Sequence, residues 1–134
     1  MGLLSGKRPT GLGFHDGKFK PCSWKPNCVS STSAAGDGKH HIAPFTIKGD
    51  AAAAWKNLTA AVKGRERVTL IEEEAGYLHA EFKSRGLGYV DDVEFALDAK
   101  AGVIHVRSAS RLGVRDFGVN RARIESLRTA LAAA

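Results

Sequence analysis

Hydrophobic and polar residues recur with two different periods along this chain, and these periods predict its helices and strands. Apolar residues recur at intervals of four, three and four from Ala51 to Val62, which is the spacing of one helix face. Asp50 is a favourable N-cap residue for this helix, and Gly64 is expected to end it. The same spacing predicts a second helix over residues 120–132.

Between the two predicted helices, apolar and polar residues alternate with a period of two, which is typical of half-buried strands. Turn residues separate these stretches, so consecutive antiparallel hairpins are expected. The predicted strands cover residues 67–73, 77–84, 89–97 and 103–110, after a short strand near 45–48. The pattern therefore predicts an α+β fold, a two-layer sandwich in which two helices cover one face of an antiparallel sheet of four to five strands.

The short turn at residues 99–102 sets the register of the last predicted hairpin. It pairs Leu97 with Ile104 on the face that meets the helices. Carried further along the two strands, this register places Asp91 opposite Ser110 on the same face. Because a buried carboxylate needs a partner or its pKa rises, Asp91 is expected to bond an arginine.

The other face of the predicted sheet carries charged residues and histidines. Glu94 is expected opposite Arg107, as a cross-strand ion pair worth about a few tenths of a kcal/mol if it is exposed. His79 and His105 also fall on this face. We expect both to be ordinary surface histidines.

The N-terminal third differs from the rest of the chain in composition. Residues 1–44 hold seven of the fifteen glycines and all four prolines, and they show no extended apolar periodicity, which predicts irregular structure. This segment and the residue after it still supply apolar side chains that can lie on a core: Phe14, Phe19, Trp24, Val29, Ile42 and Phe45. Because domains use about 150 residues, we expect one domain, with an irregular arm over 1–44 wrapped on an α+β domain over 45–134.

The net charge of +6 is distributed unevenly along the chain. The acidic residues are concentrated in the middle, and all six basic residues after position 105 are arginines. Arginine presents a planar fork that suits carboxylates and phosphates, so a small anionic ligand or an acidic protein segment is the expected partner. Nucleic acid is not favoured, because the basic residues are spread over both chain ends and the predicted sheet has no aromatic ladder.

The sequence also carries information about the compartment. The chain has no apolar run of about 20 residues, so no membrane span is expected. The opening MGLLSGKRPTGLG lacks the apolar stretch of a secretory signal, which predicts a cytoplasmic protein. The alternative is the cell envelope or periplasm.

The densest polar cluster is expected at one end of the sheet, near the start of the last helix. Its candidate ligand-binding residues are Asp91, Asp92, Arg107, Ser108, Ser110, Arg111, Asp116, Asn120 and Arg121. One interpretation is a pocket for a small anion, with Asp91 held by Arg111 or Arg121; replacing Arg111 by alanine would then abolish binding with a modest loss of stability. The other is a structural network that holds the last helix to the sheet.

Two cysteines form a second cluster. Five residues separate Cys22 from Cys28, which permits a small disulfide or two reduced thiols and is not a redox or zinc motif. His40 and His41 follow at a distance that makes a metal site or a Cys–His nucleophile pair conceivable, but neither is favoured. No metal and no cofactor are predicted, and the catalytic residues are not identified.

Four segments carry a resemblance to a known family: PCSWKPNCVSS, YLHAEF, GYVDDVEF and VIHVRSASRLGVRDFGVNRARIESLR. Over residues 21–128 the chain resembles the family catalogued as domain of unknown function 1499, which occurs in bacteria and plastids. The resemblance implies a stand-alone domain without an established activity, and some relatives carry export or lumenal targeting. The chain departs from the family pattern at residues 115–117, where Arg-Asp-Phe replaces a small polar and an aliphatic residue around the aspartate.

Two function classes follow from these observations. The leading hypothesis is a non-catalytic binding or accessory module whose arginine, aspartate and serine side chains hold a small anion or an acidic partner. The alternative is a small hydrolase-like enzyme that uses Cys28 or a serine beside Asp91. No combination of nucleophile, base and orienting residue is evident in the sequence, which counts against the enzyme.

Overall fold

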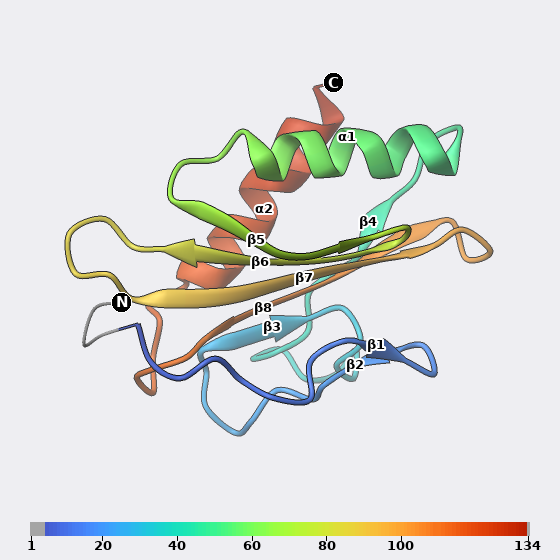
Figure 1. Ribbon diagram of the computed structural model, residues 1–134. Helices are drawn as coiled ribbons and strands as arrows, with labels where there is room; N and C mark the ends of the chain where they lie inside the picture. Colours follow the sequence, from blue (N-terminus) through green and yellow to red (C-terminus); the bar gives the residue numbers. More distant parts are fainter. Residues whose placement is uncertain (1–4, 134) are drawn as a thin grey trace.

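The strands predicted between the two helices form an antiparallel meander, as shown by the computed structural model, which describes residues 5–133 (Figure 1). The meander consists of β5 (Val68–Glu74), β6 (Tyr77–Lys83), β7 (Val90–Asp98) and β8 (Val103–Ser110). Two short strands, β3 (Cys28–Ser30) and β4 (Phe45–Thr46), both pair with β8 and complete a six-stranded sheet. The predicted α+β class is confirmed, with one strand more than expected.

The register inferred from the 99–102 turn is confirmed. Leu97 pairs with Ile104, and Asp91 pairs with Ser110. The preceding hairpin pairs Lys83 with Val90, so residues 84–89 form its loop. Tyr89, the first residue of the strand predicted over 89–97, lies in this loop and is exposed. The strand itself begins one residue later than predicted, at Val90.

Helices α1 (Ala51–Lys63) and α2 (Val119–Ala132) cover one face of the sheet. The Asp50 carboxylate accepts a hydrogen bond from the Ala53 amide at 2.9 Å, which confirms the predicted N-cap. The helices bury their apolar faces against the strands. The fully buried side chains of this core include Leu58, Val62, Leu78, Val93, Phe95, Val106, Ile124 and Leu127.

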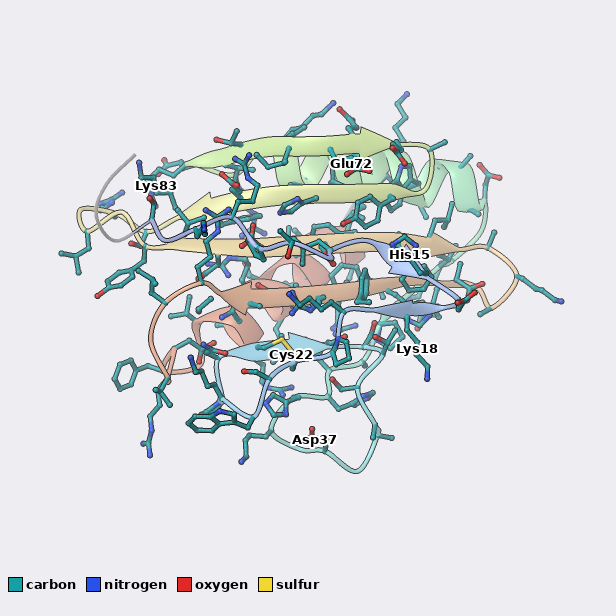
Figure 2. All side chains as sticks on the ribbon, turned by 60° about the horizontal axis from the view of Figure 1, so that its bottom comes forward. His15, Lys18, Cys22, Asp37, Glu72 and Lys83 are labelled. Carbon is teal, nitrogen blue, oxygen red and sulfur yellow. A yellow bond between two sulfur atoms is a disulfide. The ribbon has the colours of Figure 1, made fainter. Side chains whose placement is uncertain are left out.

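The opposite face of the sheet is covered by the N-terminal segment, which crosses it as an extended chain (Figures 1 and 2). This segment contains a small hairpin, β1 (Phe14–His15) with β2 (Lys18–Phe19), where irregular structure was expected. The Phe14 ring stacks on the His105 ring with centroids 5.5 Å apart. The Gly13 amide donates to the Glu94 carboxylate at 3.4 Å. Residues 1–4 of the predicted arm, and residue 134, lie outside the described residues.

Because the N-terminal segment covers the outer face, two expectations about that face were wrong. Glu94 faces Arg107 as predicted, but both side chains are buried and they form no ion pair. His79 is buried as well, and it binds the Asp92 carboxylate at 2.8 Å instead of facing water. Both expectations treated the polar face of the sheet as solvated. The division of the chain at residue 44 stays a prediction.

Candidate functional site

The nine predicted site residues lie on both faces of the sheet instead of forming one pocket. Adjacent strand residues point to opposite faces, so the cluster that is compact in sequence is divided by the sheet itself. The helix side holds Asp91, Ser108, Ser110, Asp116 and Asn120. The outer side holds Asp92, Arg107 and Arg111. Arg121 joins neither group and donates to the His41 carbonyl at 2.9 Å.

On the helix side, Asn120 is the centre of a hydrogen-bonded network. Its side-chain oxygen accepts from the Ser108 hydroxyl at 2.6 Å, and its amide donates to Ser110 Oγ at 2.9 Å and to Asp116 Oδ2 at 2.7 Å. Asp116 also accepts from the backbone amides of Gly118 and Asn120, so it caps the first turn of α2. The fully buried Asn120 thereby ties α2 to β8.

The arginine that neutralises Asp91 is Arg123, and the expected partners Arg111 and Arg121 were wrong. Its guanidinium donates to Asp91 Oδ2 at 2.7 Å and to Asn120 Oδ1 at 3.0 Å, and it lies 4.9 Å from the centroid of the Phe82 ring. Arg123 follows Asn120 by three positions, so both face the sheet from the same side of α2. This three-residue spacing is the sequence feature that could have predicted that Arg123 lies beside Asn120. Because the side chains of this Asn120 network satisfy one another, the network acts as a structural link.

On the outer side, a layer of charged residues lies between the sheet and the N-terminal segment. This ionic layer consists of His79, Glu81, Asp92, Glu94, Arg107 and Arg111, all from neighbouring strands β6, β7 and β8 or the residue that follows β8. Sequence alternation correctly placed His79, Glu94 and Arg107 on this face, but it grouped Asp92 and Arg111 with Asp91 on the other. Their burial was missed, because it depends on the path of a segment far away in the sequence.

Arg111 holds the two carboxylates of one half of the ionic layer. Its guanidinium binds Asp92 through two hydrogen bonds, at 2.7 and 2.9 Å, and it also binds Glu81. The Arg111 side chain is 3% exposed. Burial alone would raise the pKa of the Asp92 carboxyl, but the hydrogen bonds from Arg111 and His79 outweigh it and lower that pKa. Arg8 adds a more exposed ion pair to Glu81 at 2.6 Å.

The other half of the layer is less completely paired. Glu94 is 0% exposed, and its Oε2 atom has no hydrogen-bond partner among residues 5–133. Burial raises the pKa of this carboxyl, opposed by the charge of Arg107. Arg107 is 6% exposed, and its Nε donates to the Lys20 carbonyl at 2.9 Å. Burial lowers the pKa of Arg107 despite attraction from Glu94 and Asp92.

A cleft of about 250 Å³ opens next to Arg107, between the N-terminal segment, the Cys22–Cys28 loop and the ends of β7 and β8. Its lining includes five cations and two serines: Lys7, Lys20, Lys25, Arg107, Arg111, Ser23 and Ser110. Asp92 also lines the cleft, but its carboxylate is held by Arg111 and His79. The cleft therefore presents an excess of positive charge. Its three lysines were not among the predicted site residues, because they come from the N-terminal segment.

A disulfide joins Cys22 to Cys28, so the disulfide alternative is confirmed and neither cysteine is a free thiol (Figure 2). Cys28 is the first residue of β3 and pairs with Ala109 on β8. The bond therefore closes the Cys22–Cys28 loop at the edge of the sheet, and this loop supplies Ser23 and Lys25 to the cleft.

Replacement of Cys22 and Cys28 by serine is expected to lower the free energy of unfolding by about 2 kcal/mol, because it removes closure of a short loop from the unfolded chain. Urea unfolding of the double variant and of the unreduced wild-type protein measures this difference. The intact mass of unreduced, denatured wild-type protein should be two hydrogens below that of the reduced protein. Equal masses would contradict the disulfide.

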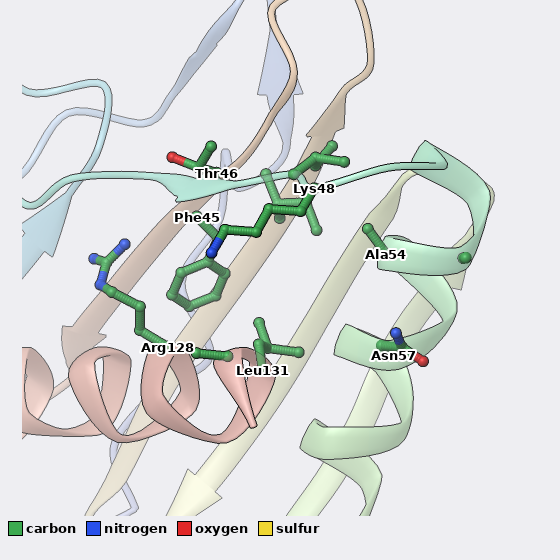
Figure 3. A pocket seen from close by; sticks show the side chains of 11 residues that line it. Phe45, Thr46, Lys48, Ala54, Asn57, Arg128 and Leu131 are labelled. Carbon is green, nitrogen blue, oxygen red and sulfur yellow. The ribbon is translucent and has the colours of Figure 1, made fainter. Parts of the chain in front are cut away.

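A larger groove, of about 430 Å³, lies on the helix side between β4, α1 and α2 (Figure 3). Its walls are mainly apolar and include Phe45, Ala54 and Leu131. Arg128 lines it too, but the guanidinium donates to the Pro44 and Ala43 carbonyls and to Glu125. None of the predicted site residues lines this groove, so its chemistry differs from that of the cationic cleft.

The described geometry does not assemble the catalytic groups of the enzyme alternative. The disulfide removes the thiol nucleophile. The serines beside Asp91 are bonded to Asn120, and His79 and His105 lie on the opposite face of the sheet. His40 binds Asp37 and the Lys25 carbonyl. These contacts account for the polar residues that the enzyme hypothesis required.

The fold and the site define a small α+β domain with two helices on one side of an antiparallel sheet and a buried ionic layer on the other. Comparison with family models gives a match over residues 18–131 to the family described as Protein of unknown function (DUF1499). The chain belongs to this family. No curated protein and no solved structure shows a significant match to this chain. Neither described helix has the length and apolar character needed to span a bilayer.

Proposed function

We propose that the protein is a binding domain that takes a small anion, a phosphate or a carboxylate, into the cationic cleft beside Arg107. The observation that supports this proposal is the burial of the Arg107 guanidinium without an ion-pair partner among the described residues. The guanidinium is almost fully buried, it donates to the Lys20 carbonyl through Nε, and no carboxylate of residues 5–133 forms an ion pair with it. Glu94 and Asp92 attract this buried cation without forming an ion pair with it, and an anion in the cleft would supply a direct partner.

The rest of the cleft supports the same chemistry. Lys7, Lys20 and Lys25 surround Arg107 with further positive charge, and the Ser23 hydroxyl can donate a hydrogen bond. A guanidinium fork with neighbouring ammonium groups suits the oxygens of phosphate or carboxylate. Four of the predicted site residues line the cleft: Asp92, Arg107, Ser110 and Arg111. Apart from Ser110, the residues of the Asn120 network do not line the cleft, and we assign that network a structural role.

The test is calorimetric titration with inorganic phosphate, pyrophosphate and acetate at low salt. In the triple variant Lys7→Gln/Lys20→Gln/Lys25→Gln, Kd for the best of these anions is expected to rise about tenfold or more, because three charges around the ligand are lost. Binding should also weaken as the salt concentration rises. In the wild-type protein the same anion should raise Tm, since a ligand that binds only the folded state stabilises it.

The matched control is Lys48→Gln/Lys56→Gln/Lys100→Gln, which changes the net charge equally at three exposed positions outside the cleft. This variant should bind as the wild-type protein does. Absence of binding by any of the three anions would overturn the proposal. An equal loss in both triple variants would also overturn it, because it would show that only the net charge matters.

A further inference from the structure

The exposed large hydrophobic side chains of residues 5–133 gather at one end of the molecule. This apolar rim consists of Trp24, Leu87, Tyr89, Leu112, Val114, Phe117 and Val119. It is formed by three loops, 22–27, 84–89 and 111–118, and by the first residue of α2. In Figure 1 the loops 84–89 and 111–118 lie at the left end of the sheet and the loop 22–27 lies below the left end of β3; in Figure 2 Lys83 marks this end.

Hydrogen bonds connect the three loops. The Asn27 side-chain amide donates to the Gly113 carbonyl at 2.7 Å, which connects the first loop to the third. The Arg111 amide donates to the Val90 carbonyl at 3.3 Å, which connects the third loop to the strand that follows the second. The opposite end of the sheet, marked by His15 and Lys18 in Figure 2, has none of these exposed large hydrophobic side chains. The rim is therefore a defined surface and not a scatter of single residues.

Phe117 is the most informative residue of the rim. Its side chain is 94% exposed, so it contributes almost nothing to the core. Its backbone has a φ of 54°, in the left-handed region that bulky residues adopt only at a cost in free energy. No packing among residues 5–133 repays that cost. A phenylalanine held in this way is explained by an apolar environment outside the folded chain.

The charges around the rim indicate what that environment is. Lys25, Arg85 and Arg115 lie in the same three loops, and the Arg85 side chain is 82% exposed although it lies 3.8 Å from Glu66. The only acidic residue in these loops is Asp116, whose carboxylate accepts the hydrogen bonds that cap α2. Aromatic and aliphatic side chains surrounded by Lys and Arg match the interface of an anionic bilayer.

We propose that the protein docks on anionic lipid surfaces through the apolar rim, with the rim side chains in the interfacial region and the basic residues at the headgroups. The side chains project from separate loop tips, and a fluid interface accepts each of them without a preformed pocket. A rigid protein partner would need a matching cavity for each. The proposal does not depend on anion binding in the cleft.

The test is co-sedimentation of the protein with vesicles of phosphatidylcholine alone or with added phosphatidylglycerol. The wild-type protein is expected to bind the anionic vesicles at least about tenfold more tightly, with weakening at high salt. Trp24 fluorescence should shift to shorter wavelength on binding. The variant Leu87→Ser/Phe117→Asn should lose about tenfold or more in affinity because it removes inserted apolar surface. Its Tm should not fall, since asparagine tolerates the positive φ better than phenylalanine.

Charge is tested separately by Arg85→Gln/Arg115→Gln, which should weaken binding about tenfold. Its matched control, Lys48→Gln/Lys100→Gln, removes two exposed cations outside the rim and should leave binding unchanged. No binding to anionic vesicles, or equal binding by the rim variant, would overturn the proposal. A concentration-dependent dimer in sedimentation velocity that Leu87→Ser/Phe117→Asn abolishes would also overturn it, in favour of a protein interface.

Discussion

Arg111→Ala is expected to lower the free energy of unfolding by about 3–5 kcal/mol. The guanidinium is buried and binds both Asp92 and Glu81, so its removal leaves the buried Asp92 without its main partner and leaves Glu81 with Arg8 alone. This expectation replaces the modest loss predicted from sequence, which treated Arg111 as a ligand-binding residue at an accessible site. Urea unfolding at neutral pH, followed by circular dichroism, measures the change.

Arg8→Ala is the matched control, because Arg8 binds the same Glu81 carboxylate from a more exposed position. It should change stability little. If Arg111→Ala does not yield folded protein, Arg111→Lys provides the measurement: it keeps the charge but loses the two-bond geometry on Asp92, so an intermediate loss is expected. Equal stability of Arg111→Ala and Arg8→Ala would contradict the structural role assigned to Arg111.

Asn120→Ala is expected to lower the free energy of unfolding by about 2–4 kcal/mol. The side chain is fully buried and bonds Ser108, Ser110 and Asp116; alanine would leave the buried Ser108 hydroxyl without its acceptor and would remove one hydrogen bond each from the half-buried Ser110 and Asp116. Because these bonds join α2 to β8, hydrogen exchange of the α2 amides should accelerate more than that of the α1 amides.

Asn57→Ala supplies the comparison for Asn120→Ala. Asn57 is an exposed residue of α1, and alanine has the higher helix propensity, so this variant should match or slightly exceed wild-type stability. A loss in Asn120→Ala no larger than in Asn57→Ala would show that the Asn120 network is dispensable. A loss without faster exchange in α2 would contradict the proposed link between helix and sheet.

The sequence predicted the order of elements and the pairing of the last two strands because both depend on local patterns. The helix face from Ala51 to Val62 and the alternation in the strands follow from the geometry of each element. The short turn after β7 left little freedom in the register, and the pairing of Leu97 with Ile104 followed. The cysteine spacing permitted the observed disulfide but did not require it.

The candidate site was predicted less well, for a physical reason that Asp91 and Asp92 illustrate. They are adjacent in sequence, yet the pleat sends one to the Asn120 network and the other to the ionic layer. Their arginine partners, Arg123 and Arg111, come from segments whose approach depends on the packing of α2 and on the path of the chain after β8. Sequence spacing does not specify such contacts.

The sequence by itself determined which residues share a face of the sheet, because side-chain direction along a strand is a local property. The tertiary structure alone decided which polar residues lost contact with water. His79, Glu94 and Arg107 have the alternation of a solvated face, but the N-terminal segment covers them and contributes the lysines of the cleft. Burial depends on what packs over a face, and in this protein the covering segment lies 81 and 87 residues away along the chain at its contacts with Glu94 and Arg107.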